Sequence, residues 1–162
     1  MLDWKERGGG GSQVRLELSE NTLCGHVSEF AVGTYKKAHF HGPGAHIIIL
    51  SGNGYSLMWP QGQPIKRYDW KPGSLVVPPA NWFHQHFNAG AEPVRYLALR
   101  WGSQKYHEMW GEGKGKVDID DKLGGNQIEY EDEDSIVPRM FQEACAKAGV
   151  KNLMGKYYKQ SA

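Results

Sequence analysis

Short apolar stretches alternate with turn-forming residues along the first two thirds of the chain. In residues 14–18 and 23–32, apolar and polar side chains alternate, which predicts strands with one buried face. Residues 46–50 form an almost continuous apolar run, which predicts a strand buried on both faces. Glycine- and proline-rich segments recur at intervals of about ten residues, which is typical of an all-β sandwich or barrel. Further strands are predicted over residues 35–41, 55–59, 65–70, 74–77, 82–87 and 94–101.

The pattern changes after Trp101. Residues 111–125 are rich in glycine, lysine and aspartate, and this composition predicts a loop. Asp134 and Ser135 favour the start of a helix, and Gly149 favours its end. The apolar side chains between them recur at helical spacing: Ile136, Met140, Phe141, Ala144 and Ala148. We expect this helix to pack outside the barrel or against a partner subunit.

Length and charge narrow the class of protein. The 162 residues suffice for one domain with a sizeable core. The 19 basic and 18 acidic side chains leave a net charge of +1, so no overall field favours a nucleic acid or a membrane surface. A small-molecule substrate is the expected partner.

Cysteine usage and the N-terminal residues bear on the compartment. Cys24 and Cys145 lie far apart in the sequence and suggest small buried thiols in a reducing compartment rather than a disulfide framework. No apolar run approaches the ~20 residues that span a bilayer, and the first residues lack the apolar region of a signal peptide. We therefore predict a cytoplasmic protein. Residues 8–12, Gly-Gly-Gly-Gly-Ser, have the composition of a flexible linker.

Histidines are concentrated in two short segments. Five of the seven in the chain are His39, His41, His46, His84 and His86. Because successive side chains of a strand point to opposite faces, His39 shares a face with His41, and His84 with His86. Imidazole is the commonest nitrogen ligand of transition metals. Two such pairs, brought together by strand pairing, predict a metal site.

The same two segments carry further fixed spacings. In the first, five residues separate Gly33 from His39-Phe40-His41. In the second, the spaced residues are Gly73, Pro79, His84 and Asn88, with Asn81 where the related motif has glycine. Together they resemble the two motifs of the cupin family, over roughly residues 14–101. The resemblance implies a double-stranded β-helix, or jelly-roll barrel, over residues 14–101. An N-terminal arm or linker (1–13) precedes it, and a loop with a C-terminal helical extension (102–162) follows.

The resemblance implies that His39, His41 and His84 are metal ligands, but the family's glutamate is missing. Four residues separate His41 from His46, and counting back from Gly52 places Ala45 at the glutamate position instead. Either His46 is a fourth nitrogen ligand, which we favour, or three histidines leave more positions open on the metal. Because bound histidines must be neutral, binding should weaken below about pH 6.

An all-nitrogen ligand set argues against Mg²⁺ and Ca²⁺, which prefer oxygen. The resemblance makes Fe(II) the first expectation, with Ni, Zn, Co, Cu and Mn as the other divalent metals. It implies a metal-dependent enzyme, and we expect a non-haem Fe(II) dioxygenase of small aromatic or diketone-like substrates. The alternatives are a metal-dependent lyase or isomerase acting on a small acid, and a non-catalytic protein that binds a small ligand.

Several residues are candidates for the substrate pocket. His86 and Tyr55 are candidate catalytic residues, although His86 could equally be a substitute ligand, a hydrogen-bond donor to a ligand, or a core histidine. Strand alternation allows only one of Arg95 and Tyr96 to point inward. The expected substrate-binding residues are Tyr55, Trp59, Phe83, Arg95 and Tyr96. Lys36, Lys37, Arg95 and Arg100 are candidates for holding a carboxylate, or are surface charges. We expect His26 and His107 to be structural.

Unpaired barrel edges favour association, because natural β-proteins cover or pair exposed edge strands. The strand over residues 14–18 and the C-terminal helix are the natural covers. We therefore predict a homodimer.

Overall fold

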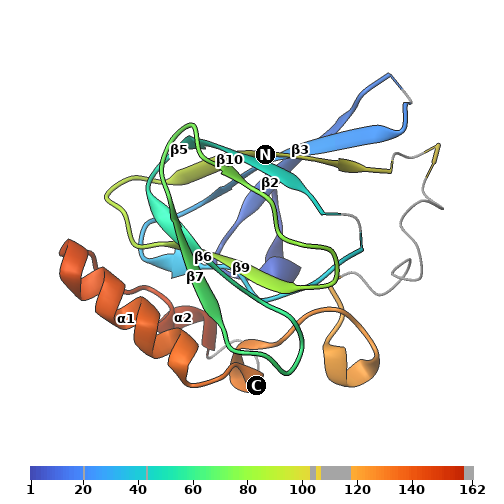
Figure 1. Cartoon of the computed structure of the whole chain (residues 1–162). Coiled ribbons are helices and arrows are strands. Elements are labelled where there is room, and N and C mark those ends of the chain that lie inside the picture. Colours follow the sequence, from blue (N-terminus) through green and yellow to red (C-terminus); the bar gives the residue numbers. More distant parts are fainter. Residues whose placement is uncertain (20, 43, 103–104, 107–117, 159–162) are drawn as a thin grey trace.

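Two antiparallel sheets face each other and enclose the interior of a barrel in the computed structural model (Figure 1). The structure describes residues 1–19, 21–42, 44–102, 105–106 and 118–158. The six-stranded sheet has the order β1 (Leu2–Asp3), β2 (Ser12–Glu17), β3 (Leu23–Phe30), β10 (Val94–Trp101), β5 (His46–Ser51) and β8 (Leu75–Val76). The four-stranded sheet has the order β4 (Thr34–Tyr35), β9 (Phe83–Asn88), β6 (Gly54–Trp59) and β7 (Lys66–Trp70). The predicted all-β jelly-roll is confirmed.

The interior between the sheets is filled from both sides. Ile47, Ile49 and Tyr96 of the six-stranded sheet pack with Met58 and Trp70 of the four-stranded sheet in one buried cluster. Removing this apolar surface from water is the main force that holds the sheets together.

The predicted strand over residues 35–41 is shorter than expected. Only Thr34 and Tyr35 form β4, and His39 adds an isolated bridge. The backbone N–H groups of Lys36 and His39 still donate to β9, at 3.1 Å and 3.0 Å. On the other side, the N–H of Lys37 donates to the Arg7 carbonyl at 2.9 Å, and Phe40 to Asn126 at 3.0 Å. This segment therefore lies between β9 and two irregular segments that are far away in the sequence.

The glycine run is not a flexible linker. Gly8, Gly9 and Gly10 have φ of +69°, +63° and +62°, a region that side-chain-bearing residues rarely adopt. A Cβ on Gly9 would lie 2.4 Å from the Tyr35 carbonyl oxygen. The run forms a packed turn, and the flanking strands β1 and β2 pair with each other at the sheet edge. The N-terminal arm is therefore part of the fold, and the linker interpretation is wrong.

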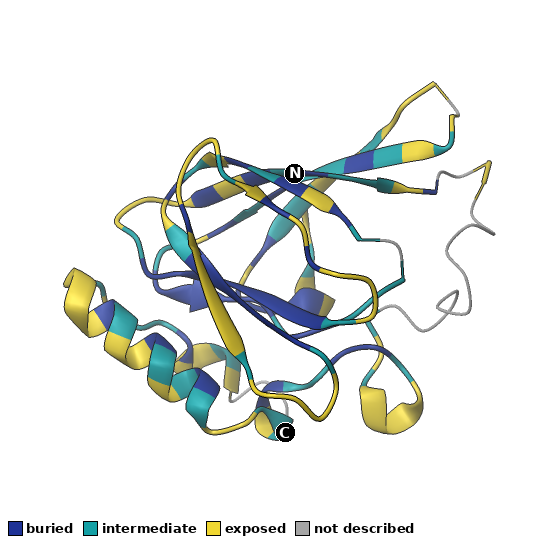
Figure 2. Ribbon diagram, in the orientation of Figure 1, coloured by how far each residue is buried: buried dark blue, intermediate teal, exposed yellow. Residues whose placement is uncertain are grey.

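Helix α1 (Ile136–Ala148) packs on the outer face of the four-stranded sheet, as expected for a helix outside the barrel (Figures 1 and 2). Its fully buried side chains are Val137, Phe141 and Cys145. Of the predicted stripe, Phe141 is buried and Ile136, Met140 and Ala144 pack partly buried against the same cluster, whereas Ala148 is exposed. Gly149 ends the helix in the left-handed conformation, as predicted. Shorter elements are η1 (Lys5–Arg7), η3 (Asp121–Leu123), η4 (Tyr130–Asp132) and α2 (Gly155–Tyr158). No helix of the described residues is long and apolar enough to cross a membrane.

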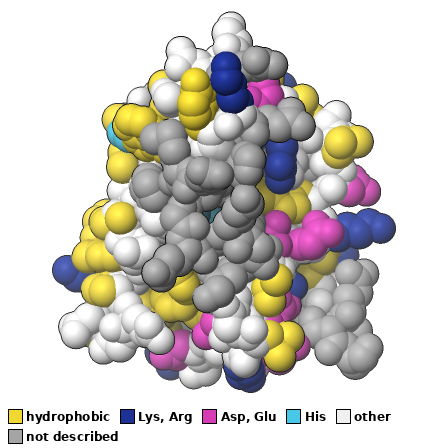
Figure 3. Space-filling view, turned by 90° about the vertical axis from the view of Figure 1, so that its right-hand side faces the viewer, with side chains coloured by type: hydrophobic (Ala, Val, Ile, Leu, Met, Phe, Trp, Pro, Cys, Tyr) yellow, Lys and Arg dark blue, Asp and Glu magenta, His cyan; other side chains and the backbone are white. Residues whose placement is uncertain are grey.

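Three remaining predictions concern the cysteines, the loop over residues 111–125 and the balance of charge. Both cysteines are free thiols; Cys145 is buried, as predicted, and Cys24 is only half-buried. Of the predicted loop over residues 111–125, residues 118–125 form turns around η3, and the earlier part lies outside the described residues, as does His107. On the face shown in Figure 3, basic and acidic side chains lie next to one another, in keeping with the nearly balanced charge.

The outer face of the six-stranded sheet carries an aligned apolar row. Strand register places in line Val14, Val27, Leu97, Ile48 and Leu75. The next row contains an ion pair in which Arg95 Nε lies 2.8 Å from Glu29 Oε2. The face is thus apolar with balanced charge at its border, so it does not repel a copy of itself. We propose that a second copy of this chain covers it, in a two-fold sheet-on-sheet contact.

Leu97 lies at the centre of this row, so Leu97→Lys is expected to convert a dimer into a monomer, because it would bury an unpaired ammonium group. The measurement is size-exclusion chromatography with light scattering at micromolar concentration. Leu123→Lys, which changes an exposed leucine in η3, is the matched control and should leave the mass unchanged. A monomeric wild-type protein would contradict the proposal.

Candidate metal centre

Strand β9 has one face toward the barrel interior and one face toward helix α1, and all six of its residues are buried. His84 and His86 point into the interior, where His86 Nδ1 and Ser56 Oγ share a 2.8 Å hydrogen bond. Phe83 and Phe87 point the other way and belong to the cluster under α1. Alternation along one strand therefore separates the two histidines from the two aromatic residues that flank them.

Three histidines meet in the interior. His39 and His84 form an antiparallel bridge, with N–H to carbonyl distances of 3.0 Å and 2.8 Å in the two directions. Their ring centroids lie 4.2 Å apart, and that of His41 lies 4.8 Å from His84. One ring nitrogen of each residue lies within 4.8 Å of the others. Two ligands on one ion are at most ~4 Å apart when bonds are ~2.1 Å long, so a small contraction would close the group around a metal.

The hydrogen bonds of these rings test whether the group fits a metal. His84 Nδ1 lies 3.0 Å from the Trp82 carbonyl oxygen, and His39 Nδ1 lies 3.4 Å from that of Lys37. A carbonyl oxygen only accepts, so each Nδ1 must donate its proton and each Nε2 keeps a lone pair. Burial lowers the pKa of His84 to about 4 and that of His39 well below its usual range. Neutral imidazoles with bare nitrogens suit a transition metal.

His46 is not part of this group. Ile47 and Ile49 of β5 point into the barrel, so alternation turns His46 outward, and its side chain is exposed. Ala45, at the position of the family's glutamate, is buried in the interior cluster. Among the described residues the group therefore consists of three histidines without a carboxylate. This placement favours the second alternative, in which three histidines leave more positions open.

Most of the predicted substrate-binding residues face away from the centre. Ser56 and Met58 point inward, so Tyr55 and Trp59 point outward, where Tyr55 stacks on Phe87 at 4.6 Å. Phe83 also faces outward, packed against Trp59. An interior aromatic pocket built from Tyr55, Trp59 and Phe83 is therefore not what the structure contains.

Of Arg95 and Tyr96, the arginine is exposed and the tyrosine is buried, as alternation requires. Tyr96 faces the interior with its ring centroid 5.6 Å from that of His86. His86 is buried but is not part of the three-histidine group, and its ring centroid lies 5.9 Å from that of His84. His26, expected to be structural, packs edge-on against Tyr96, and burial lowers its pKa to about 3.

Two buried cations complete the interior. Lys36, considered above either for a carboxylate or for the surface, is only 1% exposed, and its Nζ donates to Ser28 Oγ and to Tyr96 Oη. Arg7 pairs with Asp118 at 2.8 Å. Burial lowers the pKa of both cations, that of Arg7 to about 10. Arg7 gives no signal in the sequence, because its burial depends on the packed glycine turn that follows it.

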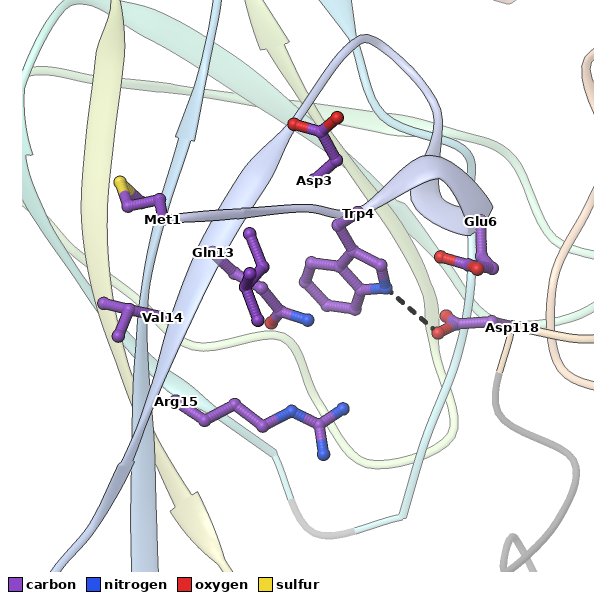
Figure 4. Close-up of a pocket in the computed structure, with 9 residues that line it drawn as sticks. Met1, Asp3, Trp4, Glu6, Gln13, Val14, Arg15 and Asp118 are labelled. Atoms are coloured by element: carbon purple, nitrogen blue, oxygen red, sulfur yellow. Dashed lines mark hydrogen bonds between the residues drawn. The ribbon is translucent and has the colours of Figure 1, made fainter.

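Beside these residues a cavity of about 810 Å³ opens at the N-terminal segment (Figure 4). Trp4 lines it and donates from Nε1 to Asp118 Oδ2 at 3.1 Å, and Gln13 and Arg15 line it from β2. The Trp4 ring also lies 5.1 Å from Lys36 Nζ. Trp4 thus contacts both the cavity and the buried lysine.

Comparison with known proteins identifies the fold. No family model and no curated protein matches the sequence. Among solved structures, the formate complex of Lactobacillus farciminis oxalate decarboxylase is 17% identical with a TM-score of 0.52, covering 57% of this chain and 29% of that one. A Bacillus subtilis oxalate decarboxylase with Mn(II) centres is 15% identical with a TM-score of 0.55, covering 62% and 28%. The chain spans less than a third of the length of these proteins. It has the cupin fold, as the two motifs predicted.

A second polar cluster, which the sequence analysis missed, lies on the opposite face of β9. The Glu133 carboxylate accepts from Tyr35 Oη at 2.7 Å and from Gln85 Nε2 at 3.0 Å. Burial raises the pKa of Glu133 to about 7, although both hydrogen bonds act in the other direction. A glutamate in an acidic run gives no indication in the sequence that it is buried.

Metal content tests the ligand group. His84→Ala should remove most of the bound metal, because the remaining two imidazoles bind a divalent ion far more weakly. His46→Ala should retain it, since that side chain points away from the group. Elemental analysis of metal per chain is the measurement, and loss of metal in His46→Ala would contradict the three-histidine assignment.

Glu133 predicts a pH-dependent stability. Its raised pKa means that the folded state holds a proton which the unfolded chain releases near pH 4.5, so this stabilisation is present at low pH and is lost as pH rises to about 7. Glu133→Gln should therefore gain stability relative to wild type across this range, by roughly 1–3 kcal/mol. Urea unfolding between pH 4.5 and 8 measures the difference. The exposed neighbour supplies the control, since Glu131→Gln should show no such gain.

Proposed function

We propose that this protein is a metal-dependent enzyme that acts on a small organic anion at the group formed by His39, His41 and His84. The observation that carries the proposal is the charge of the interior. Three neutral imidazoles would leave a bound divalent ion with its full charge, and Arg7 and Lys36 add two buried basic side chains. Among the ion pairs of the described residues, a single carboxylate pairs with either of these two side chains, namely Asp118 with Arg7. An anion is the ligand that such an interior stabilises.

Three protein ligands support oxygen chemistry at Fe(II). A six-coordinate ion held by three histidines keeps up to three positions, which is enough for a chelating substrate and O₂ together. Bound Fe(II) would supply the electrons that activate O₂. The first candidate reaction is therefore the oxidative cleavage expected of a non-haem Fe(II) dioxygenase.

The interior residues have roles that follow from their contacts. Lys36 Nζ and the Tyr96 hydroxyl lie 3.2 Å apart and can together hold a carboxylate or enolate oxygen. His86, neutral because burial keeps its pKa well below the usual range, lies between His84 and Tyr96, where its ring can hydrogen-bond the substrate. These residues favour an acid or the enolate of a diketone over an uncharged aromatic substrate, because Tyr55, Trp59 and Phe83, the aromatic residues expected to bind the substrate, pack on the other side of the sheet.

A metal-dependent lyase that needs no oxygen is the second candidate. The oxalate decarboxylases that share the fold, one of them with Mn(II) centres, favour it, because their substrate is a small dicarboxylate. Here the metal would act as a Lewis acid on a bound carboxylate or carbonyl group. The third possibility is a protein that binds a small ligand through the same buried charges without catalysing a reaction.

Turnover with and without oxygen separates these candidates. The protein is loaded with Fe(II) or Mn(II) and given oxalate, malonate, pyruvate or acetylacetone, and O₂ uptake and CO₂ release are measured under air and under argon. We expect O₂ uptake with Fe(II) and a loss of turnover under argon. Turnover retained under argon would exclude the oxygenase in favour of the lyase. Ligand binding without turnover under any condition would leave the binding protein.

The matched variants Lys36→Met and Lys37→Met test the anion site. Lys36→Met should lower kcat/KM by about tenfold or more without loss of metal, since it removes a buried charge that holds the substrate. Lys37 instead pairs with Glu129, so Lys37→Met should have little effect. Equal activity of the two variants would contradict the role of Lys36.

A further inference from the structure

A separate cavity of about 250 Å³ lies on the outer face of the four-stranded sheet, next to the polar cluster of Glu133. It is bounded by the turn after β6 and by residues 128–137. Its apolar walls are Ala38, Trp59, Ile65, Ile128 and Val137. The volume is just below the ~300–1,000 Å³ of pockets that hold drug-sized ligands, so its occupant must be smaller.

One polar atom at this cavity has no partner. Gln85 lines it and is fully buried. Its Nε2 donates to the Lys36 carbonyl at 3.2 Å and to Glu133 Oε1 at 3.0 Å. Both partners only accept hydrogen bonds, so the atom that faces them must be the amide nitrogen. The amide oxygen Oε1 therefore points away from them. That oxygen is buried without a hydrogen-bond partner among the described residues. Such an atom is costly to bury unless a ligand or a water donates to it.

The charged groups at the cavity are acidic. They are Asp132, Glu133 and Asp134. The nearby lysines are already paired, Lys122 with Asp132 and Lys37 with Glu129. Asp134 Oδ1 accepts from the N–H of Ile136 at 2.9 Å, so the positive end of helix α1 is satisfied as well. No ion pair of the described residues includes Glu133, and the cavity therefore offers acceptors and negative charge.

We propose that this cavity binds a small organic cation, a primary ammonium group on a short apolar body. The ammonium donates to Gln85 Oε1 and to the Glu133 carboxylate, and the apolar body packs against Trp59 and its apolar neighbours. Three donors of an ammonium group match this all-acceptor lining, and the indole ring adds attraction for the charge. An anion of the same size is disfavoured by Glu133 and Asp134, the acidic side chains at the cavity that the ion pairs of the described residues do not include.

This site is distinct from the metal centre. Gln85 lies between His84 and His86 in β9, but its side chain is on the opposite face of the sheet. Binding of an amine therefore needs neither the metal nor the substrate of the interior site. A failure of the proposed enzymatic function would leave this inference untouched.

Calorimetric titration of the full chain with benzylammonium tests the proposal, with benzoate as the anion of similar size. We expect saturable one-to-one binding of benzylammonium, with the same affinity for metal-free and metal-loaded protein, and none of benzoate. Glu133→Gln and Gln85→Leu should each weaken binding by about tenfold or more. Glu131→Gln changes an exposed acid that does not line the cavity and should bind like wild type.

Three outcomes would overturn the proposal. One is the absence of saturable heat with benzylammonium up to about 10 mM, which is weaker than a specific site would show. The second is equal binding of benzoate, or binding unchanged in Glu133→Gln. The third is a crystal grown with benzylammonium in which a water alone donates to Gln85 Oε1. Circular dichroism checks that each variant is folded. If Gln85→Leu does not fold, Glu133→Gln still decides the test.

Discussion

Two backbone hydrogen bonds between His39 and His84 hold the candidate metal centre together. They join a short irregular segment to the central strand of the smaller sheet, and they bring two imidazoles from distant parts of the chain to 4.2 Å. The other side of the segment is held by the carbonyls of Arg7 and Asn126. The N-terminal turn, the barrel and the segment after residue 118 therefore all fix the same few residues. Backbone groups in such a buried position must be paired, and here their pairing sets the position of the ligands.

Strand β9 separates two chemically opposite environments. Its inner face carries His84 and His86, which burial keeps neutral, beside buried cations that favour anions. Its outer face carries Gln85, beside a group of acids that favours cations. A single strand with a period of two can serve both because alternate side chains never share a face.

Local spacing predicted an all-β fold and two histidine pairs, and the resemblance to the two cupin motifs added the barrel and the group of His39, His41 and His84. Strand period and motif intervals are both local properties of the sequence. The same period correctly allowed only one of Arg95 and Tyr96 inside. It could not place Tyr55, Trp59 and Phe83, because their strands are buried on both faces, one against the interior and one against α1. Periodicity shows that such a strand has two faces, and it does not show which of them is the inner one. His46 was wrongly predicted to be a ligand for a related reason. The turn before β5 determines which residues of that strand face inward, and His46 is not one of them.

The burial of Lys36 and Arg7 depends on contacts between segments that no sequence pattern connects. Lys36 is enclosed by side chains of β3, β10 and the N-terminal segment, among them Ser28, Tyr96 and Trp4. A lysine next to another lysine resembles a surface residue by composition, and only the assembled barrel shows otherwise. Sequence reasoning is weakest where a charge is stabilised by tertiary contacts rather than by its neighbours in the chain.

The packed turn of Gly8, Gly9 and Gly10 has a practical meaning for anyone who expresses this protein. The run looks like an artificial spacer, and a shortened gene that begins after it would seem harmless. Such a truncation would delete Trp4 and Arg7, and would remove the acceptor of the Lys37 N–H, the ring beside Lys36 and the partner of Asp118. The glycine run is therefore a structural part of the barrel, and it is not a spacer that can be removed.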